Sequence, residues 1–478
     1  MTIRAEDAAA GKLKILILRE DAIGDMVLAM PVVSALHDRF PSAEITVLVS
    51  NYSGNGELIA HLPYVHELML SPQIQSFRDV LAFAKVLRSK KFTHSVHLST
   101  RAGTSWACFL GVSKNSGDKA VLGLLPVFFR WGRFCPPHDM MVHQVQRNFG
   151  LLRPFGLSER DAASWPLRLT PHPDDAAAVR EKLQTRGFDF GKKTLCIHLG
   201  AAGGNKPVLP DKYAAYAMSL HRDSPDIQIM ITGASDEEKS FRDQFLAKID
   251  FPVIDMVGAT RLREVLTLLT YCHVFVGIDT GPAHMAAGLG VPQLLLSTSK
   301  RVLPFKWGPW LNRHRIVREN SRCAISCHAR ACAEWTCVDD LSVADMVRHT
   351  VALFAGDGYA TFDDQQLYWF QTAMPMLVLV DDVSRTRGQF LVETWRSWGL
   401  TVHLAEVADP ALYDKCVAWD IRIIQNLSSR KKVRLFVMAQ MLNKGLSHPP
   451  LLCHGDPACE TVLSLLAHYR GLFSRRIL

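Results

Sequence analysis

Two polar turns in this sequence combine carboxylates, glycine and basic side chains directly after apolar runs. The first, Arg19 to Asp25, follows the run Ile15 to Leu18. The second, Asp279 to His284, follows the run Val274 to Ile278. If both runs are strands of parallel sheets, both turns lie at the sheet edge where open α/β proteins bind ligands.

The first turn ends in Gly24-Asp25, just before a segment with helical apolar spacing that begins at Met26. Gly24 allows a close backbone approach, and Asp25 offers a carboxylate that could take a proton from a reacting hydroxyl. The alternative is that Asp25 only caps the helix. The turn lacks the glycine spacing of a dinucleotide fingerprint and the lysine of a P-loop.

The second turn reads Asp279-Thr280-Gly281-Pro282-Ala283-His284. Thr280 can cap a helix, and Pro282 suits its first turn. The N–H groups at this helix start would form a site for a diphosphate, to which His284 could donate a hydrogen bond. The alternative is that His284 is a core histidine bonded to backbone.

A third segment, Gly200 to Lys206, joins an apolar run to a helical segment. Its glycines free the backbone to wrap around an anion, and Lys206 adds a positive charge. A flexible surface loop with a solvated lysine is the alternative.

Strands and helices alternate along the chain in two successive series. The first series includes a helix over Met26 to Phe40 and a strand over Ile45 to Val49, and it continues to about Leu157. The second starts near Leu195. The pattern predicts two doubly wound parallel sheets with a cleft between them. Beyond Phe362, strands at Met376 to Val380, Val402 to Val407, Ile421 to Ile424 and Leu435 to Val437 and a helix over Arg387 to Trp398 predict a smaller α/β module.

Taken together, these segments resemble the glycosyltransferase family 9 heptosyltransferases, which build the inner core of bacterial lipopolysaccharide. The resemblance covers about residues 12 to 350 and rests on both polar turns, on His198 to Lys206, and on Thr232-Gly233 with Glu237. It implies a GT-B fold of two Rossmann-like lobes that face a cleft. We expect an acceptor-side lobe at residues 12–170, a donor-binding lobe at 190–355 and an additional domain at 362–478.

The resemblance also implies roles for single residues. Asp25 would be the general base, with Gly24 and Arg101 on the acceptor side. The donor would be an ADP-heptose or a similar nucleotide sugar, and no metal or other cofactor would be needed. The residues implied for the donor site are Ala201, Ala202, Lys206, Glu237, Asp279, Thr280, Gly281 and His284. The implied reaction is transfer with inversion to a hydroxyl of a lipid-linked core or similar glycan.

Composition and charge limit the compartment and the partners. The net charge of +8 over 478 residues favours an acidic partner only weakly, and we expect no nucleic-acid partner. We find no charged-then-apolar leader in Met1 to Gly11 and no apolar run of about 18 residues. We therefore expect a cytoplasmic protein with peripheral contact to the inner membrane.

Four of the eleven cysteines, Cys323, Cys327, Cys332 and Cys337, are clustered. They could hold zinc or iron, or they could be reduced thiols that pack a crossover segment. Two basic segments, Phe128 to Phe134 and Lys85 to Lys91, could touch a phosphorylated lipid or could be an aromatic turn and a solvated helix face.

Three other functions fit parts of the sequence. One is a nucleotide-sugar-binding scaffold without turnover, against which Asp25 and His284 argue. A second is a heptosyltransferase that acts on protein. A third is a metal-dependent redox or regulatory protein built around the cysteines.

Overall fold

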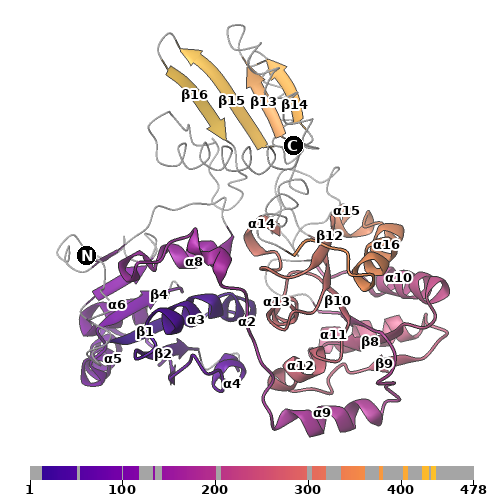
Figure 1. The fold of residues 1–478 in the computed structure, drawn as a ribbon, viewed down its shortest axis with the longest axis horizontal. Coiled ribbons are helices and arrows are strands. Elements are labelled where there is room, and N and C mark those ends of the chain that lie inside the picture. The colour runs from indigo at the N-terminus through magenta and orange to yellow at the C-terminus, as the bar shows by residue number, and fades with distance from the viewer. Residues whose placement is uncertain are drawn as a thin grey trace.

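The computed structural model describes residues 13–50, 54–99, 101–112, 114–117, 133–134, 143–200, 206–298, 304–318, 335–360, 376–380, 402–406, 422–429 and 432–437. Two large parallel sheets, each flanked by helices, lie side by side, and a third sheet is separate from both (Figure 1). Among the described residues, none of the helices combines the length and apolar character that crossing a bilayer requires.

The N-terminal lobe is built on six parallel strands in the order β3-β2-β1-β4-β5-β6. The strands are β1 Lys14–Arg19, β2 Glu44–Val49, β3 Glu67–Leu70, β4 His94–His97, β5 Lys114–Gly117 and β6 Arg133–Phe134. The helices are α2 Ile23–Val27, α3 Met30–Arg39, α4 Asn55–Ile59, α5 Phe77–Lys90, α6 Ala102–Gly111 and α8 Gln144–Gly150.

The C-terminal lobe is built on a second parallel sheet in the order β12-β11-β10-β7-β8-β9. Its strands are β7 Thr194–His198, β8 Gln228–Thr232, β9 Val253–Asp255, β10 Val274–Gly277, β11 Gln293–Ser297 and β12 His314–Arg318. The helices from α9 onward are α9 Asp175–Gln184, α10 Pro210–Asp223, α11 Asp236–Leu246, α12 Leu262–Leu269, α13 Gly281–Gly288, α14 Pro304–Trp307, α15 Thr336–Asp339 and α16 Val343–Phe354.

The third sheet has the order β14-β13-β15-β16, in which only the β15–β16 pair is antiparallel. Its strands are β13 Met376–Val380, β14 Val402–Glu406, β15 Arg422–Ser429 and β16 Lys432–Val437. All four overlap strands predicted from the sequence. The predicted helix over Arg387 to Trp398 lies outside the described residues.

The first strand shows why the sheets are covered on both faces. Leu16 and Leu18 pack with α5 and α6, whereas Ile15 and Ile17 point to the opposite face and join the cluster that contains α3. Side chains alternate along a strand, so a run that is apolar at every position is buried on both sides. The α/β class and the two doubly wound sheets predicted from the sequence are therefore confirmed.

One predicted helix is wrong in detail. The segment Met26 to Phe40 was expected to be continuous, but α2 ends at Val27 and α3 begins at Met30. Pro31 lies in the first turn of α3, where its missing N–H needs no partner. The proline therefore starts a second helix, and α2 becomes a short turn of its own next to the end of β1.

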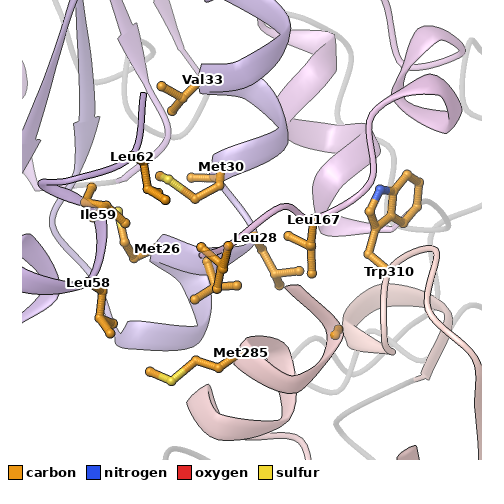
Figure 2. Packing of buried hydrophobic residues seen from close by; sticks show 14 of the residues in the cluster. Met26, Leu28, Met30, Val33, Leu58, Ile59, Leu62, Leu167, Met285 and Trp310 are labelled. Atoms are coloured by element: carbon orange, nitrogen blue, oxygen red, sulfur yellow. The ribbon is translucent and has the colours of Figure 1, made fainter. Parts of the chain in front are cut away.

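The two lobes share one apolar core. Met26, Leu28 and Leu58 of the N-terminal lobe belong to the same buried cluster as Met285 and Trp310 of the C-terminal lobe (Figure 2). The connecting chain runs between them. Its contacts are Trp310 Nε1 to the Trp165 carbonyl at 3.0 Å, Leu169 N to the Gly288 carbonyl at 2.9 Å and His61 Nε2 to the Thr170 carbonyl at 2.7 Å.

The residue that precedes α8 adds two more contacts to this seam. His143 precedes α8, stacks on the Trp310 ring at 4.7 Å and bonds through Nε2 to the Gly308 carbonyl at 2.9 Å. The seam therefore fixes how the carboxyl edges of the two sheets face each other. The predicted limits of the three domains stay predictions.

Candidate active site

The turn after β1 is organised by a buried arginine. The guanidinium of Arg19 donates to the Leu98 carbonyl and forms an ion pair with Asp25 Oδ1, and Asp21 Oδ2 lies 3.6 Å from it. The Arg19 side chain is 3% exposed, whereas that of Asp25 is 24% exposed. Asp25 is therefore held by one oxygen while its carboxylate still reaches solvent.

Glu20, the neighbour of Arg19, was not singled out from the sequence. It is buried, and it accepts hydrogen bonds from Ser71 Oγ, from Ser99 Oγ at 3.3 Å and from Thr104 Oγ1 at 2.7 Å. Ser71 comes directly after β3, Ser99 lies just after β4, and Thr104 belongs to α6. Glu20 thus ties together the loops at the carboxyl edge of the N-terminal lobe. Its place directly after the last residue of a buried strand was the only sequence signal.

Burial raises the pKa of Asp21, although the nearby Arg19 charge opposes this, and Arg101 also acts to lower it. Arg101 is exposed and immediately precedes α6, where its carbonyl accepts from Ser105 N at 3.1 Å. Arg101, the predicted acceptor-side residue, therefore lies close enough to the first turn for its positive charge to affect the carboxyl group of Asp21.

The second turn is also built around a paired carboxylate. Asp279 Oδ1 lies 2.9 Å from Nε2 of the buried His284, one turn into α13. Within the described residues Nδ1 of His284 has no hydrogen-bond partner. Thr280 does not cap α13 through its side chain as expected; its hydroxyl bonds to the Ile278 carbonyl at 3.2 Å instead. The first N–H groups of a helix have no partner within the helix, so this edge can receive an anion.

The two turns touch across the lobe boundary. A Cβ at Gly24 would lie 2.8 Å from Cδ2 of His284, and a Cβ at Gly281 would lie 3.0 Å from Cγ2 of Ile23. Gly24 is needed for this approach, because a Cβ there would overlap His284, and a Cβ at Gly281 would press tightly against Ile23. The structure therefore brings the candidate base Asp25 and the candidate diphosphate site together at one boundary.

Lys206 lies deeper than the sequence suggests. Its side chain is fully buried, with Nζ 5.0 Å over the ring of Trp335, and its carbonyl accepts from Thr298 Oγ1 at 2.7 Å. A cation above an indole face is stabilised by the ring electrons. Ala201 and Ala202 lie outside the described residues. The lysine is therefore enclosed by the chain after β11 and by Trp335.

Glu237, the predicted nucleoside contact, is exposed in the first turn of α11. Its neighbour Glu238 turns toward the end of β7, where a Cβ at Gly200 would lie 1.9 Å from Glu238 Oε1 and 2.6 Å from His198 Nε2. Burial alone would raise the pKa of Glu238, but the N–H groups of Ala234 and Ser235 and the nearby His198 hold it below its usual value. Glu238 therefore faces the strand edge as a carboxylate.

The predicted cysteine cluster is represented by Cys337 alone, because Cys323, Cys327 and Cys332 lie outside the described residues. Cys337 is buried, with its Sγ 3.1 Å from the Thr298 carbonyl. No group of three or more His, Cys, Asp or Glu side chains suited to a metal occurs in the described part of the chain. The aromatic segment from Phe128 lies almost wholly outside it too.

Two facing α/β lobes, with a carboxylate on one and an anion-binding helix start on the other, define a GT-B glycosyltransferase architecture. The model of glycosyltransferase family 9 (heptosyltransferase) matches residues 80–335, which is more than half of the sequence. The chain belongs to this family, and the protein is a glycosyltransferase.

Relatives and solved structures agree with this assignment. The lipopolysaccharide core heptosyltransferase OpsX of Haemophilus influenzae is 23% identical over 305 residues, which cover 63% of this chain and 83% of the relative. Lipopolysaccharide heptosyltransferase 3 of Escherichia coli is 23% identical over 299 residues, or 60% of this chain and 82% of the relative.

The fold is similar to two solved structures. A family 9 glycosyltransferase from Veillonella parvula superposes with a TM-score of 0.63 at 14% identity, covering 75% of this chain and 99% of the other. The E. coli ADP-heptose lipopolysaccharide heptosyltransferase II gives 0.57 at 19% identity, covering 72% and 99%. At these identities the likeness supports the fold, and the chemistry depends on the residues described above.

Proposed function

We propose that this enzyme transfers a heptose, with inversion, from ADP-heptose to a hydroxyl of a lipopolysaccharide core acceptor. The observation that carries the proposal is the contact between the turn of Asp25 and the turn of Asp279 and His284. Relatives named lipopolysaccharide heptosyltransferases, and a solved neighbour named an ADP-heptose heptosyltransferase, support the donor and the acceptor class.

In the proposed reaction Asp25 accepts the proton of the acceptor hydroxyl as its oxygen attacks the anomeric carbon. The bond from that carbon to the diphosphate oxygen breaks, and its electron pair leaves with ADP. The N–H groups at the start of α13, with His284 and Lys206, would stabilise the added negative charge. Attack from the side opposite the leaving group inverts the anomeric configuration.

The donor site would include Thr280, Gly281 and His284 at the diphosphate and Asp279 at the sugar. Ala201, Ala202 and Lys206 would come from the loop after β7, and α11 would contribute Glu237 together with its inward-facing neighbour Glu238. On the acceptor side we place Gly24 and Arg101. We further propose that the transfer uses no metal, because the positive groups named above can meet the leaving charge; turnover should then persist in a chelator.

We also propose that the enzyme works in the cytoplasm, in peripheral contact with the inner membrane where a lipid-linked acceptor would be found.

The test is transfer from ADP-heptose to a heptose-free core acceptor by the full chain and by Asp25→Asn. General base catalysis contributes about 10²–10⁴-fold, so we expect turnover to fall by about that factor while calorimetry shows unchanged donor binding. Asp21→Asn is the matched control, because Asp21 shares the same arginine but lies 3.6 Å from it. Unchanged turnover in Asp25→Asn would refute the base assignment. A wild-type chain that binds donor without turnover would indicate a scaffold.

A further inference from the structure

Exposed apolar side chains are concentrated around α5. Eight large apolar side chains are exposed in the described residues, and four of them fall between Leu70 and Val86. Their exposed fractions are 57% for Leu70, 65% for Phe77, 49% for Leu81 and 44% for Val86. Single exposed apolar residues are ordinary, but four within one short segment mark a candidate interaction surface.

The helix itself is firmly anchored, so this exposure is not a sign of a loose element. Ser76 and Asp79 form a capping box at its start, and Val80, Phe83, Ala84 and Leu87 are buried against the sheet. Phe77, Leu81 and Lys85 recur every four residues, and residues so spaced share a face of a helix. The stripe they form therefore lies on the solvent-exposed side of α5, beside its buried face.

The charges around the stripe are mostly positive. Between Glu67 and Lys91 the sequence has five basic and two acidic residues. Both acidic residues are engaged within the protein: Glu67 pairs with Lys90 at 2.5 Å, and Asp79 accepts from Ser76 N at 2.8 Å. Arg88 is also engaged, because it donates to the Leu110 carbonyl at 2.9 Å.

Three basic residues of this segment are exposed and can contact an external anionic group. Arg78, Lys85 and Lys91 are exposed, and none of them forms an ion pair among the residues that the structure describes. A basic helix face with a large aromatic and a leucine matches the surface of a bilayer that contains acidic phospholipids. An acidic protein partner is the alternative, and binding to protein-free vesicles distinguishes the two.

We propose that the exposed face of α5, together with Leu70, docks the enzyme onto an anionic phospholipid surface. Phe77 and Leu81 would enter the interfacial region, and Arg78, Lys85 and Lys91 would contact the acidic head groups. Figure 1 shows α5 on the side of the N-terminal lobe that is turned away from the C-terminal lobe. Docking there would leave the boundary between the lobes open to a donor from the aqueous side.

The surface is also linked to the candidate acceptor site. The chain between β3 and α5 carries Ser71, whose hydroxyl bonds to Glu20, and Ile74, which lies where a Cβ at Gly103 would come within 2.8 Å. A helix docked on lipid would thus be connected through Ser71 and Glu20 to the loops that carry the candidate acceptor site. This inference rests on the proposed function for its biological role, but the binding itself does not require turnover.

The test is co-sedimentation of the full chain with vesicles. We expect binding to vesicles that contain phosphatidylglycerol, weak binding to pure phosphatidylcholine, and loss of binding at high salt. The double variant Phe77→Ser with Leu81→Ser should lower the partition coefficient about tenfold, since two interfacial apolar side chains are lost. Arg78→Gln with Lys85→Gln should give a similar loss that is confined to the acidic vesicles.

The matched control is Met218→Ser with Val351→Ser, which removes two exposed apolar side chains from helices of the other lobe. It should bind vesicles like the wild type. Circular dichroism and thermal unfolding check that each variant is folded. The proposal would be overturned if the wild type did not bind vesicles, or if the Phe77 and Leu81 variant bound them equally well. It would also be overturned if this variant lost self-association and kept its lipid binding.

Transfer assays separate this proposal from the proposed reaction. With a deacylated, water-soluble acceptor the Phe77 and Leu81 variant should turn over like the wild type, whereas with an acceptor embedded in vesicles its rate should fall. A wild type that is inactive on both acceptors yet binds acidic vesicles refutes the reaction and leaves the docking surface standing. If the wild type is active and the Phe77 and Leu81 variant matches its rate on each of the two acceptors, the docking surface is refuted and the reaction is not.

Discussion

Arg19 decides how the carboxylate of Asp25 is held. Its guanidinium has two acceptors, the Leu98 carbonyl and Asp25, and only a planar group with several donors can meet both at once. Arg19→Met would leave a buried carbonyl unpaired and a carboxylate without its partner, so we expect a loss of about 2–4 kcal/mol of unfolding free energy and a lower turnover. The unfolding free energy and the turnover of Arg19→Lys should fall between those of the wild type and those of Arg19→Met.

The control for this prediction is Arg153→Met, which removes an exposed ion pair to Glu159 in the same lobe. Exposed pairs contribute about 0–1 kcal/mol, so both stability and turnover should change little. Chemical denaturation and initial-rate kinetics are the measurements. Equal effects of the two substitutions would contradict the role of Arg19 in holding Asp25.

The adjacent glutamates of α11 allow a matched pair of variants. Glu238 faces Gly200 and His198, whereas Glu237 is exposed. We expect Glu238→Ala to raise the KM for donor about tenfold, because a charged hydrogen bond contributes about 1.5–3 kcal/mol, and Glu237→Ala to raise it less. Steady-state kinetics with varied donor decide between them. A larger effect of Glu237→Ala would favour the residue that the family resemblance implies.

At the scale of elements, the crossing of α2 and α13 leaves no room for a side chain at Gly24. Gly24→Ala would place a methyl group 2.8 Å from Cδ2 of His284, closer than real Cβ contacts. We expect His284 or the lobe boundary to shift and turnover to fall at least tenfold, since small misplacements of reacting groups can cost about 10²-fold. Gly191→Ala is the control, because a Cβ there meets only Asp189 Oδ1 at 3.3 Å. Similar turnover in both variants would contradict the close crossing.

The sequence predicted the elements that position the site better than the contacts within it. Apolar runs and their spacing placed β1, β7, β10 and their turns, because strand burial and chain alternation are local properties. The break between α2 and α3 was missed because the apolar spacing continues through Leu28 and Ala29 while Pro31 starts a new helix. Local spacing does not reveal where one helix gives way to another.

Contacts made by distant segments could not be predicted in this way. Glu20 meets Ser71, Ser99 and Thr104, which lie 51, 79 and 84 residues further along the chain. Lys206 meets Trp335 and Thr298 only because the loops after β7 and β11 lie at one sheet edge. The turn motifs indicated which sheet edge carries the site. The fold then determined which side chain turns inward, and in α11 this is Glu238 and not Glu237.

At the scale of the whole molecule, the lobes are joined by an apolar seam that contains buried histidines. Trp310 is fully buried between the Trp165 carbonyl and the His143 ring, and the cluster around it reaches from Met26 to Met285. A seam of this kind favours one arrangement of the lobes. It also makes the stability of that arrangement depend on keeping His143 neutral, because an imidazolium would be costly among apolar neighbours.

This dependence gives a prediction for acidic conditions. Burial lowers the pKa of His143 to about 3 and that of His314, at the start of β12, to about 4. In the unfolded chain each pKa is about 6.5, so below that pH the unfolded state takes up protons that the folded state refuses. Stability is complete above about pH 6.5 and is lost as the pH falls toward about 4, by about 2 kcal/mol for each histidine at pH 5.

The measurement is chemical denaturation at pH 7 and at pH 5, followed by the intrinsic tryptophan fluorescence of the whole chain. The double variant His143→Gln with His314→Gln should be less stable than the wild type at pH 7 but should lose about 4 kcal/mol less between the two pH values. His66→Gln is the control, since it replaces a histidine whose side chain is 59% exposed. An acid response that is the same in the double variant and the wild type would show that other groups, and not these two histidines, couple the folded lobes to pH.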